Sequence, residues 1–298
     1  MRKAVIRVEL WYTDQHTKNV RFSMKVEQQI ASCESEFQRI DILKTSEFGK
    51  VLVLDGELMI TQKDEFIYHE MITHVPMAVH PHVRDVLVIG AGDGGTIREL
   101  CKYDTIEHID MVEIDKKVTD MCLEHFWETS CRLDDPRVHM HFEESLRYVR
   151  MMKDEYDLII VDCADPYGPA EGLFTREFYG TCYKALREDG ILINQHESPY
   201  YSEHSRTVQK AHKHIKIVFP YSTVYQCHIP SYPSGHWLFG FASKKYDPIA
   251  DLREDEWNRL GINTRYYNTD LHKGSFYLPT YVKQLLDTVS YTHLRAHE

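Results

Sequence analysis

The sequence predicts an α/β protein, in which a doubly wound, mostly parallel sheet follows a small N-terminal antiparallel β domain. From Val86 onward, short apolar runs alternate with helical stretches, and this alternation is typical of a parallel sheet covered on both faces. Before residue 64, alternating segments and turn signals indicate short strands. We place the domains at 1–63 and 64–289, and we expect residues 290–298 to be a frayed or non-native tail.

The N-terminal segments have the composition of antiparallel strands. Residues 20–26 alternate loosely between polar and apolar side chains. The run 48–60 is interrupted by Asp55-Gly56, a dipeptide that favours a tight turn, and therefore predicts a β-hairpin. Residues 64–79 then have helical character and begin the larger domain.

The larger domain is predicted to contain strands at 86–90, 108–114, 138–142, 158–162, 191–195, 223–229 and 238–242, with helices that include 116–126 and 175–186. In open parallel sheets, ligands bind beyond the carboxyl ends of the strands. That rule places four acidic residues along one edge of the sheet, namely Asp93, Glu113, Glu144 and Asp162.

Composition excludes several classes of partner. The 298 residues carry a net charge of −11, from 35 basic and 46 acidic side chains, so we expect no nucleic-acid partner. We find no apolar run long enough for a signal peptide or a membrane-spanning helix, and we expect no membrane partner. The seven cysteines are scattered without C-x-x-C spacing, which favours reduced thiols and a cytoplasmic location.

A glycine-rich loop, Gly90-x-Gly92-x-x-Gly95, follows the strand at 86–90. Its glycines permit a tight turn and close approach to a ligand, and the next helix offers free backbone amides. Glu113 ends the following strand, where a ribose-binding acid belongs. Asp93 would repel a pyrophosphate, so we favour a cationic nucleoside such as a sulfonium. The alternative interpretation is that these residues bind no ligand and form only a tight strand-to-helix turn beside a solvated glutamate.

A second acidic loop follows the strand at 158–162, where Asp162 and Asp165 flank Cys163-Ala164. Two carboxylates at the end of an apolar strand can bind ammonium groups, and a partly desolvated carboxylate is a candidate base. An Asx-type turn that caps the next helix explains the same pattern without a ligand. The glycine loop in the same sheet favours the site.

Other polar segments are ambiguous from the residues alone. His69 and His74 are five positions apart, about 140° around a helix, so they would not share a metal with Glu70, and we expect no metal site. Gln195 follows another predicted strand, and Tyr232 lies in a segment that fits either a binding site or a rigid turn.

The order and spacing of these motifs resemble the spermidine synthases of the polyamine aminopropyltransferase family, from about residue 26 to residue 289. The matching segments are Gln38-Arg39-Ile40, Val51-Leu52-Val53-Leu54-Asp55-Gly56, Asp64-Glu65-Phe66-x-Tyr68-His69-Glu70-Met71, Gly92-Asp93-Gly94-Gly95, Glu113-Ile114-Asp115, Asp162-x-x-Asp165-Pro166-x-Gly168-Pro169, Tyr232-Pro233-Ser234-Gly235 and Tyr266-Tyr267-Asn268.

The resemblance implies transfer of an aminopropyl group from decarboxylated S-adenosylmethionine to putrescine, giving spermidine and methylthioadenosine. It also implies a class I methyltransferase-like Rossmann fold, a homodimer or homotetramer, and no cofactor besides the cosubstrate. Asp162 would accept the proton of the attacking amine. Donor-binding residues would be Gln38, Gly92, Asp93, Gly94, Glu113, Glu144, Ser145 and Pro169, and amine-binding residues would be Tyr68, His69, Asp162, Asp165, Gln195 and Tyr232.

The chain departs from the family pattern at three places. Glu144-Ser145 stand where Asp-Gly or Asp-Ala is common, Cys163-Ala164 replace two hydroxyl residues, and Phe37 replaces a tyrosine. An S-adenosylmethionine-dependent methyltransferase would share the glycine loop but would not need Asp93, and a catalytically silent polyamine-binding protein would share the whole scaffold. The acceptor also stays open among putrescine, cadaverine, agmatine and spermidine.

Overall fold

The computed structural model describes residues 9–163 and 172–287, and the chain divides into two compact units, 1–65 and 66–298. The first unit is a five-stranded antiparallel sheet in the order β1-β2-β3-β4-β5. Its strands are β1 (Leu10–Thr17), β2 (Val20–Glu34), β3 (Arg39–Thr45), β4 (Gly49–Leu54) and β5 (Glu57–Thr61).

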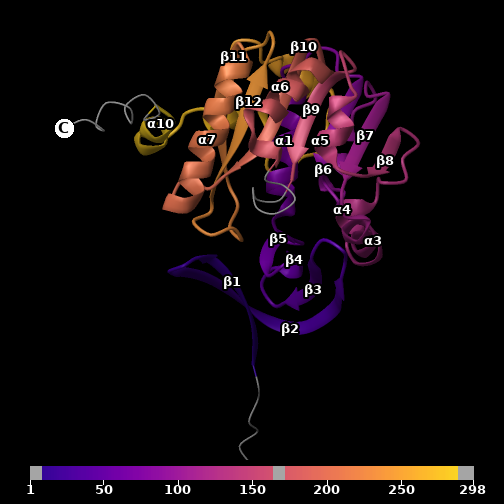
Figure 1. Ribbon diagram of the computed structural model, residues 1–298, viewed down its shortest axis with the longest axis vertical. Helices are drawn as coiled ribbons and strands as arrows, with labels where there is room; N and C mark the ends of the chain where they lie inside the picture. Colours follow the sequence, from indigo (N-terminus) through magenta and orange to yellow (C-terminus); the bar gives the residue numbers. More distant parts are fainter. Residues whose placement is uncertain (1–8, 164–171, 288–298) are drawn as a thin grey trace, which may run out of the picture. The chain divides into compact units, whose positions relative to one another are not determined.

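The predicted hairpin is present in this first unit, because Leu54 pairs with Glu57 across the turn at Asp55-Gly56. Both turn residues have positive φ angles, as a tight hairpin connection requires. The strand predicted at 20–26 is part of a longer element, since β2 continues to Glu34 with two register shifts against β3. Such shifts bend a strand, and β2 is visibly curved (Figure 1).

The second unit contains a seven-stranded sheet in the order β11-β12-β10-β9-β6-β7-β8. Its strands are β6 (Asp85–Gly90), β7 (His108–Glu113), β8 (Val138–Phe142), β9 (Tyr156–Asp162), β10 (Leu186–Glu197), β11 (Tyr221–His228) and β12 (His236–Ser243). The five neighbouring strands β10, β9, β6, β7 and β8 run parallel, whereas β12 and β11 add an antiparallel edge. All seven predicted strands are therefore confirmed, although β10 is much longer than the predicted 191–195.

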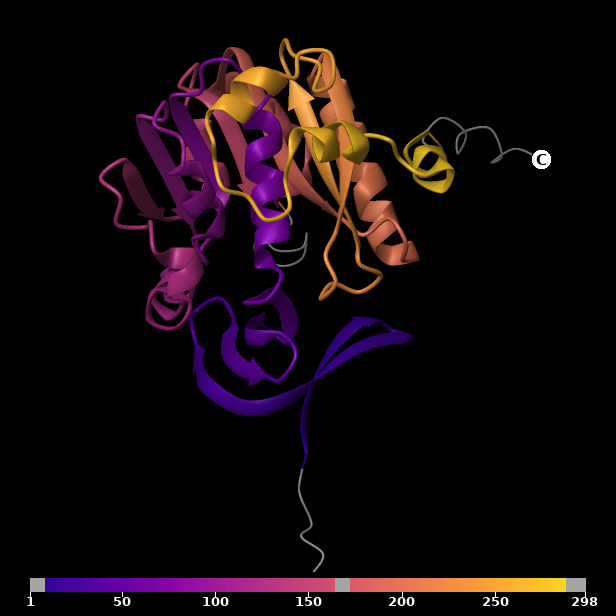
Figure 2. The ribbon, with the colours of Figure 1, turned by 180° about the vertical axis from the view of Figure 1, so that it is seen from behind.

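Helices cover both faces of this sheet, which confirms the doubly wound α/β class. The helices are α1 (Glu65–Met77), α2 (Gly95–Leu100), α3 (Lys116–His125), α4 (Trp127–Ser130), α5 (Ser145–Arg150), α6 (Arg176–Ala185), α7 (Ser202–Val218), α8 (Glu254–Arg259), α9 (Thr269–Ser275) and α10 (Thr280–Asp287). Helices α5, α6 and α7 lie on the face seen in Figure 1, and α1 lies on the opposite face with α8 and α9 (Figure 2).

The two faces of the sheet carry separate apolar cores because successive side chains of a strand point to opposite sides. On β6, Val86 and Val88 pack with Met71 of α1, whereas Leu87 and Ile89 pack with Phe178 of α6. Both cores are fully buried, so the strands read as continuous apolar runs. No helix in the described part of the chain combines the length and the apolar character needed to cross a bilayer.

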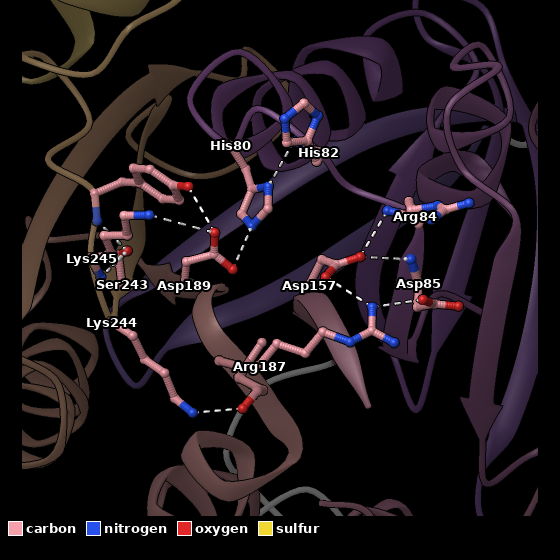
Figure 3. A network of polar contacts seen from close by, with 12 residues as sticks. His80, His82, Arg84, Asp85, Asp157, Arg187, Asp189, Ser243, Lys244 and Lys245 are labelled. Atoms are coloured by element: carbon pink, nitrogen blue, oxygen red, sulfur yellow. Dashed lines mark hydrogen bonds and ion pairs between the residues drawn. The ribbon is translucent and has the colours of Figure 1, made fainter. Parts of the chain in front are cut away.

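The amino ends of the parallel strands are joined by a network of paired charges (Figure 3). The Arg187 guanidinium contacts Asp85 at 2.7 Å and Asp157 at 2.9 Å. Asp157 also accepts the backbone N–H of Arg84 at 2.8 Å and that of Asp85 at 3.0 Å. These contacts connect β6, β9 and β10 at one end of the sheet.

The strand order reverses between β6 and β9. From β6 the sheet extends through β7 and β8 on one side, and through β9 and β10 on the other. In doubly wound sheets, such a switch point opens a crevice at the carboxyl ends of the two central strands, which is the usual place for a ligand. Both acidic loops predicted from the sequence begin there.

Candidate active site

The two acidic loops meet at the switch point because the carboxyl ends of β6 and β9 are in direct contact. Gly90 pairs with Asp162 in the sheet, and the N–H of Ala91 donates to the Asp162 carbonyl at 2.9 Å. Gly90 has a φ of 87°, and a Cβ atom there would lie 2.0 Å from the same carbonyl oxygen. Only glycine therefore allows this close approach.

The carboxylate of Asp162 is held by two hydroxyl donors from different helices. The Tyr68 hydroxyl of α1 donates to Oδ1 at 2.7 Å, and the Thr96 hydroxyl of α2 donates to Oδ2 at 2.6 Å. Burial and the nearby Asp93 charge raise the pKa of Asp162, although His69 and the two hydroxyls oppose the shift. A buried carboxylate with a raised pKa can accept a proton in a reaction.

Asp93 has the opposite electrostatic behaviour. Burial disfavours its charge, but His69 and the Gly95 N–H outweigh burial, and the pKa of Asp93 is lowered. The Nε2 atom of His69 lies 3.3 Å from Asp93 Oδ1, and the Gly95 N–H donates to Oδ1 at 2.8 Å. Two neighbouring carboxyl groups with pKa values pushed apart are suited to different roles, with Asp93 kept as the anion and Asp162 as the base.

Gly95 is required for the contact between α1 and the glycine loop. A Cβ atom at Gly95 would lie 2.2 Å from Cε1 of His69, so any other residue would displace the imidazole from Asp93. The residue before it, Gly94, is the N-cap of α2 with a φ of 86°. The glycine loop therefore holds an acidic side chain and a histidine together at the start of a helix.

Glu113 ends β7, the strand beside β6, as predicted. Its side chain lies against Gly92, where a Cβ atom would be 2.9 Å from Oε2. The Asp115 N–H donates to Oε1 at 2.9 Å. Burial raises the pKa of Glu113 to about 7, which is the behaviour of a carboxyl group set into a site rather than on the surface.

Gln195 and Tyr68 both contact the segment Asp162-Cys163. Gln195 lies in β10 and is buried, and its Nε2 donates to the Cys163 carbonyl at 3.3 Å. No donor within the described residues reaches the Gln195 Oε1 atom. Tyr232 precedes β12, and its ring packs edge-to-face on Trp237 at a centroid distance of 4.7 Å. Tyr232 also contributes, after burial and Asp162, to the raised pKa of Tyr68.

The other predicted donor-binding and amine-binding residues fall into three groups. Glu144 is exposed at the start of α5, and Ser145 is buried with its hydroxyl 3.5 Å from the Val112 carbonyl. Gln38 belongs to the separate N-terminal unit. Asp165 and Pro169 lie outside the described residues.

The polar residues of α1 contact three different partners. His69 reaches the glycine loop, whereas Glu70 accepts the backbone N–H groups of residues 265–267 at 2.7–2.9 Å. His74 bonds to Glu99 at 2.9 Å. Helix α1 therefore positions Tyr68 and His69 through the contacts that Glu70 and His74 make further along the helix.

Within the ranges 9–163 and 172–287, no group of three or more His, Cys, Asp or Glu residues is arranged to hold a metal ion.

Two residues of the site were not predicted from the sequence. Thr96 bonds to the Asp162 carboxylate, and the Thr129 hydroxyl donates to the Asp93 carbonyl at 2.7 Å. A threonine in the first turn of a helix is common, and no spacing in the sequence connects Thr96 or Thr129 to an aspartate 66 or 36 positions away.

The fold is that of the class I methyltransferase-like Rossmann enzymes, and two acidic loops meet at the switch point of its sheet. Comparison with known proteins identifies the family. Residues 65–253 match the family model described as spermine/spermidine synthase domain, and residues 10–62 match the one described as spermidine synthase tetramerisation domain.

Similar proteins cover nearly the whole chain. A polyamine aminopropyltransferase of Lachnoclostridium phytofermentans is 76% identical over 94% of this chain and 99% of its own, and one of Alkaliphilus oremlandii is 64% identical with the same coverage. A spermidine synthase crystallised with the transition-state analogue AdoDATO has a TM-score of 0.92 at 42% identity, over 96% of this chain and 98% of that one.

The spermidine synthase of Thermotoga maritima superposes with a TM-score of 0.90 at 42% identity, over 96% of this chain and 97% of that one. The chain therefore belongs to the spermidine synthase family.

Proposed function

We propose that this enzyme transfers an aminopropyl group from decarboxylated S-adenosylmethionine to putrescine, with spermidine and methylthioadenosine as products. The observation that carries the proposal is the carboxylate pair Asp93 and Asp162 at the switch point. Neither forms a salt bridge with a lysine or arginine of the described residues. Two such carboxylates suit a sulfonium donor and an amine acceptor, which both carry positive charge.

In the reaction, the amine nitrogen attacks the carbon next to the sulfonium. The new N–C bond forms as the C–S bond breaks, and the bonding electrons move to sulfur, which leaves as a neutral thioether. The amine must first lose its proton, and the reference pKa of such an ammonium is about 10.4. Asp162 accepts this proton, because its raised pKa makes it a better base than an exposed aspartate.

The donor occupies the β6 and β7 side of the switch point in this proposal. Glu113 accepts hydrogen bonds from the ribose hydroxyls, and Gly92 and Gly94 bring the backbone close to the nucleoside. Asp93, kept ionised by His69, binds the ammonium of the aminopropyl group. Gln38, Glu144, Ser145 and Pro169 complete the donor site by family resemblance alone.

The acceptor occupies the β9 and β10 side. The Oε1 atom of Gln195 is a buried acceptor without a donor among the described residues, so it can receive an ammonium or amine hydrogen. Tyr68 donates to Asp162 and cannot also donate there, which leaves its lone pairs for the amine. Asp165 and Tyr232 hold the far end of the diamine by resemblance.

Asp93 also favours aminopropyl transfer over methyl transfer. S-adenosylmethionine carries a carboxylate beside its ammonium, and this carboxylate would be repelled by an ionised aspartate nearby. The decarboxylated donor has only the ammonium. We therefore expect much tighter binding of the decarboxylated donor, measured for both compounds by calorimetry.

The assembly proposed for this chain is a homodimer or homotetramer. The match of residues 10–62 to a tetramerisation domain supports association through the N-terminal unit. We place the enzyme in the cytoplasm, where reduced thiols suit the free cysteines that the structure describes. Light scattering on the purified protein measures the oligomeric state directly.

The decisive experiment is to incubate the purified protein with decarboxylated S-adenosylmethionine and putrescine, and to detect methylthioadenosine and spermidine by mass spectrometry. Cadaverine, agmatine and spermidine as separate acceptors define the specificity. Formation of a methylated amine from S-adenosylmethionine would favour the methyltransferase instead, and binding of both substrates without any product would favour a silent polyamine-binding protein.

A further inference from the structure

Asp162 is enclosed by donors in a way that the proposed proton transfer does not by itself explain. Tyr68 of α1 donates to one carboxylate oxygen and Thr96 of α2 donates to the other. Thr96 is fully buried in the first turn of α2, next to the glycine loop. Its hydroxyl points at the carboxylate rather than at solvent, although a buried apolar side chain would fill the same space.

We propose that Thr96 is a positioning residue for the base, which fixes the plane of the Asp162 carboxylate and limits its proton affinity. This inference rests on the proposed role of Asp162 as proton acceptor. An ionised carboxylate accepts about four hydrogen bonds, and Thr96 and Tyr68 take one on each oxygen. The remaining lone pairs then keep a fixed direction, and proton transfer depends on that direction.

A hydroxyl suits this position better than a cationic side chain does. Lysine or arginine would stabilise only the ionised carboxylate and would lower its pKa far enough to stop it from accepting a proton. A hydroxyl donates while Asp162 is ionised, and it can accept once Asp162 carries the proton. Thr96 can therefore stay hydrogen-bonded in both protonation states of the base.

The electrostatic surroundings of Asp162 make such a donor necessary. Asp93 faces it from the glycine loop and raises its pKa together with burial, whereas His69 and Tyr68 face it from α1 and lower the pKa. Without Thr96, the balance among these described groups moves further towards the protonated carboxyl. A protonated Asp162 cannot serve as a base.

The test uses an isosteric substitution that removes only the hydroxyl. We expect Thr96→Val to lower kcat about 10- to 100-fold near neutral pH, the scale of one hydrogen bond to a charged group. The acid limb of its kcat profile should move to higher pH by about one unit. The donor KM should stay within about twofold, because the threonine has no part in donor binding.

Two further variants separate positioning from packing. Thr96→Ser keeps the hydroxyl and should restore the wild-type pH profile. Thr119→Val makes the same chemical change at a buried α3 position whose hydroxyl has no partner among the described residues, and it should leave the profile unchanged. An unshifted acid limb in Thr96→Val, or no rescue by serine, would overturn the proposal.

A readout that needs no substrate keeps this inference separate from the proposed function. The Asp162 carboxyl can be titrated by carbon-13 NMR, with Asp162→Asn to assign its signal. Thr96→Val should raise the measured Asp162 pKa, and Thr96→Ser should not. If wild-type protein formed no methylthioadenosine, the proposed function would fail, and the NMR titration would still decide whether Thr96 controls Asp162. Equal titrations in wild type and Thr96→Val would reject that control.

Discussion

The two ends of the seven-stranded sheet treat their carboxylates in opposite ways. At the amino end, Asp85 and Asp157 share the guanidinium of Arg187 (Figure 3). At the carboxyl end, Asp162 accepts hydrogen bonds from two neutral hydroxyls, and its electrostatic neighbours are the Asp93 carboxylate and His69. Both ends belong to the same strands, because β9 begins next to Asp157 and ends at Asp162.

The pKa shifts follow this difference. At the amino end, burial disfavours the charge of Arg187, but the contacts with Asp157 and Asp85 outweigh burial and raise the pKa of Arg187. At the carboxyl end, burial raises the pKa values of Asp162 and Glu113. Charge is thus satisfied within the protein at one end, and at the other end it is arranged for a ligand. Substitutions at the two ends should separate stability from activity.

The largest effect is expected for Asp162. Asp162→Asn should lower single-turnover rates roughly 100-fold or more, the scale of a lost general base, and Asp162→Ala should do the same. The melting temperature should stay the same or rise, because the substitution removes a buried charge next to Asp93. Near-normal turnover would remove Asp162 from the role of base, and a large fall in stability would contradict the contrast between the two ends.

Asp157 should show the reverse pattern. Asp157→Ala removes one of the two carboxylates that contact Arg187 and leaves two backbone N–H groups without their acceptor, and it should cost about 3 kcal/mol of unfolding free energy. Urea unfolding measures this loss, and kcat per folded molecule should stay close to the wild-type value. Glu155→Ala, at an exposed position of the same segment, should change stability by less than about 0.5 kcal/mol.

Glu113 should make donor binding depend on pH. With a pKa of about 7 in the free protein, its carboxylate is the minor form below that pH and cannot accept the ribose hydroxyls. Donor affinity measured by calorimetry should therefore fall as pH decreases through 7, by up to about tenfold per unit. Glu113→Gln should bind weakly with little pH dependence in this range, and an unchanged pH dependence would exclude Glu113 as its source.

The smallest effect concerns two buried histidines whose rings pack edge-to-face, His196 of β10 and His212 of α7. Burial lowers the pKa of His196 to about 3 and that of His212 to about 4, below the value of about 6.5 in an unfolded chain. The unfolded chain therefore gains protons first on acidification, so the stability present above pH 6.5 is lost as pH falls. Each should cost about 1 kcal/mol between pH 7 and pH 5.5. Between pH 7 and pH 5.5, the unfolding free energy of His212→Gln should therefore fall by about 1 kcal/mol less than that of the wild type, as measured by urea unfolding.

Sequence patterns predicted the positions of the strands and loops, because apolar runs and turn residues are local signals. The apolar runs at 86–90 and 158–162 predict buried strands, and the loops that follow must then lie at the carboxyl end of a parallel sheet. The parts that were missed depend on distant partners. The bends of β2 arise from register shifts against β3, and the length of β10 depends on its pairing with both β9 and β12.

The sequence by itself determined that Asp93, Glu113 and Asp162 follow strands of one sheet. Only the tertiary structure decided that Asp93 is held as an anion by His69, and that Tyr68 and Thr96 donate hydrogen bonds to Asp162 from 94 and 66 residues away. The reason is that hydrophobic periodicity acts between near neighbours in the chain, whereas a pKa depends on whichever charges and donors the fold brings within a few ångströms.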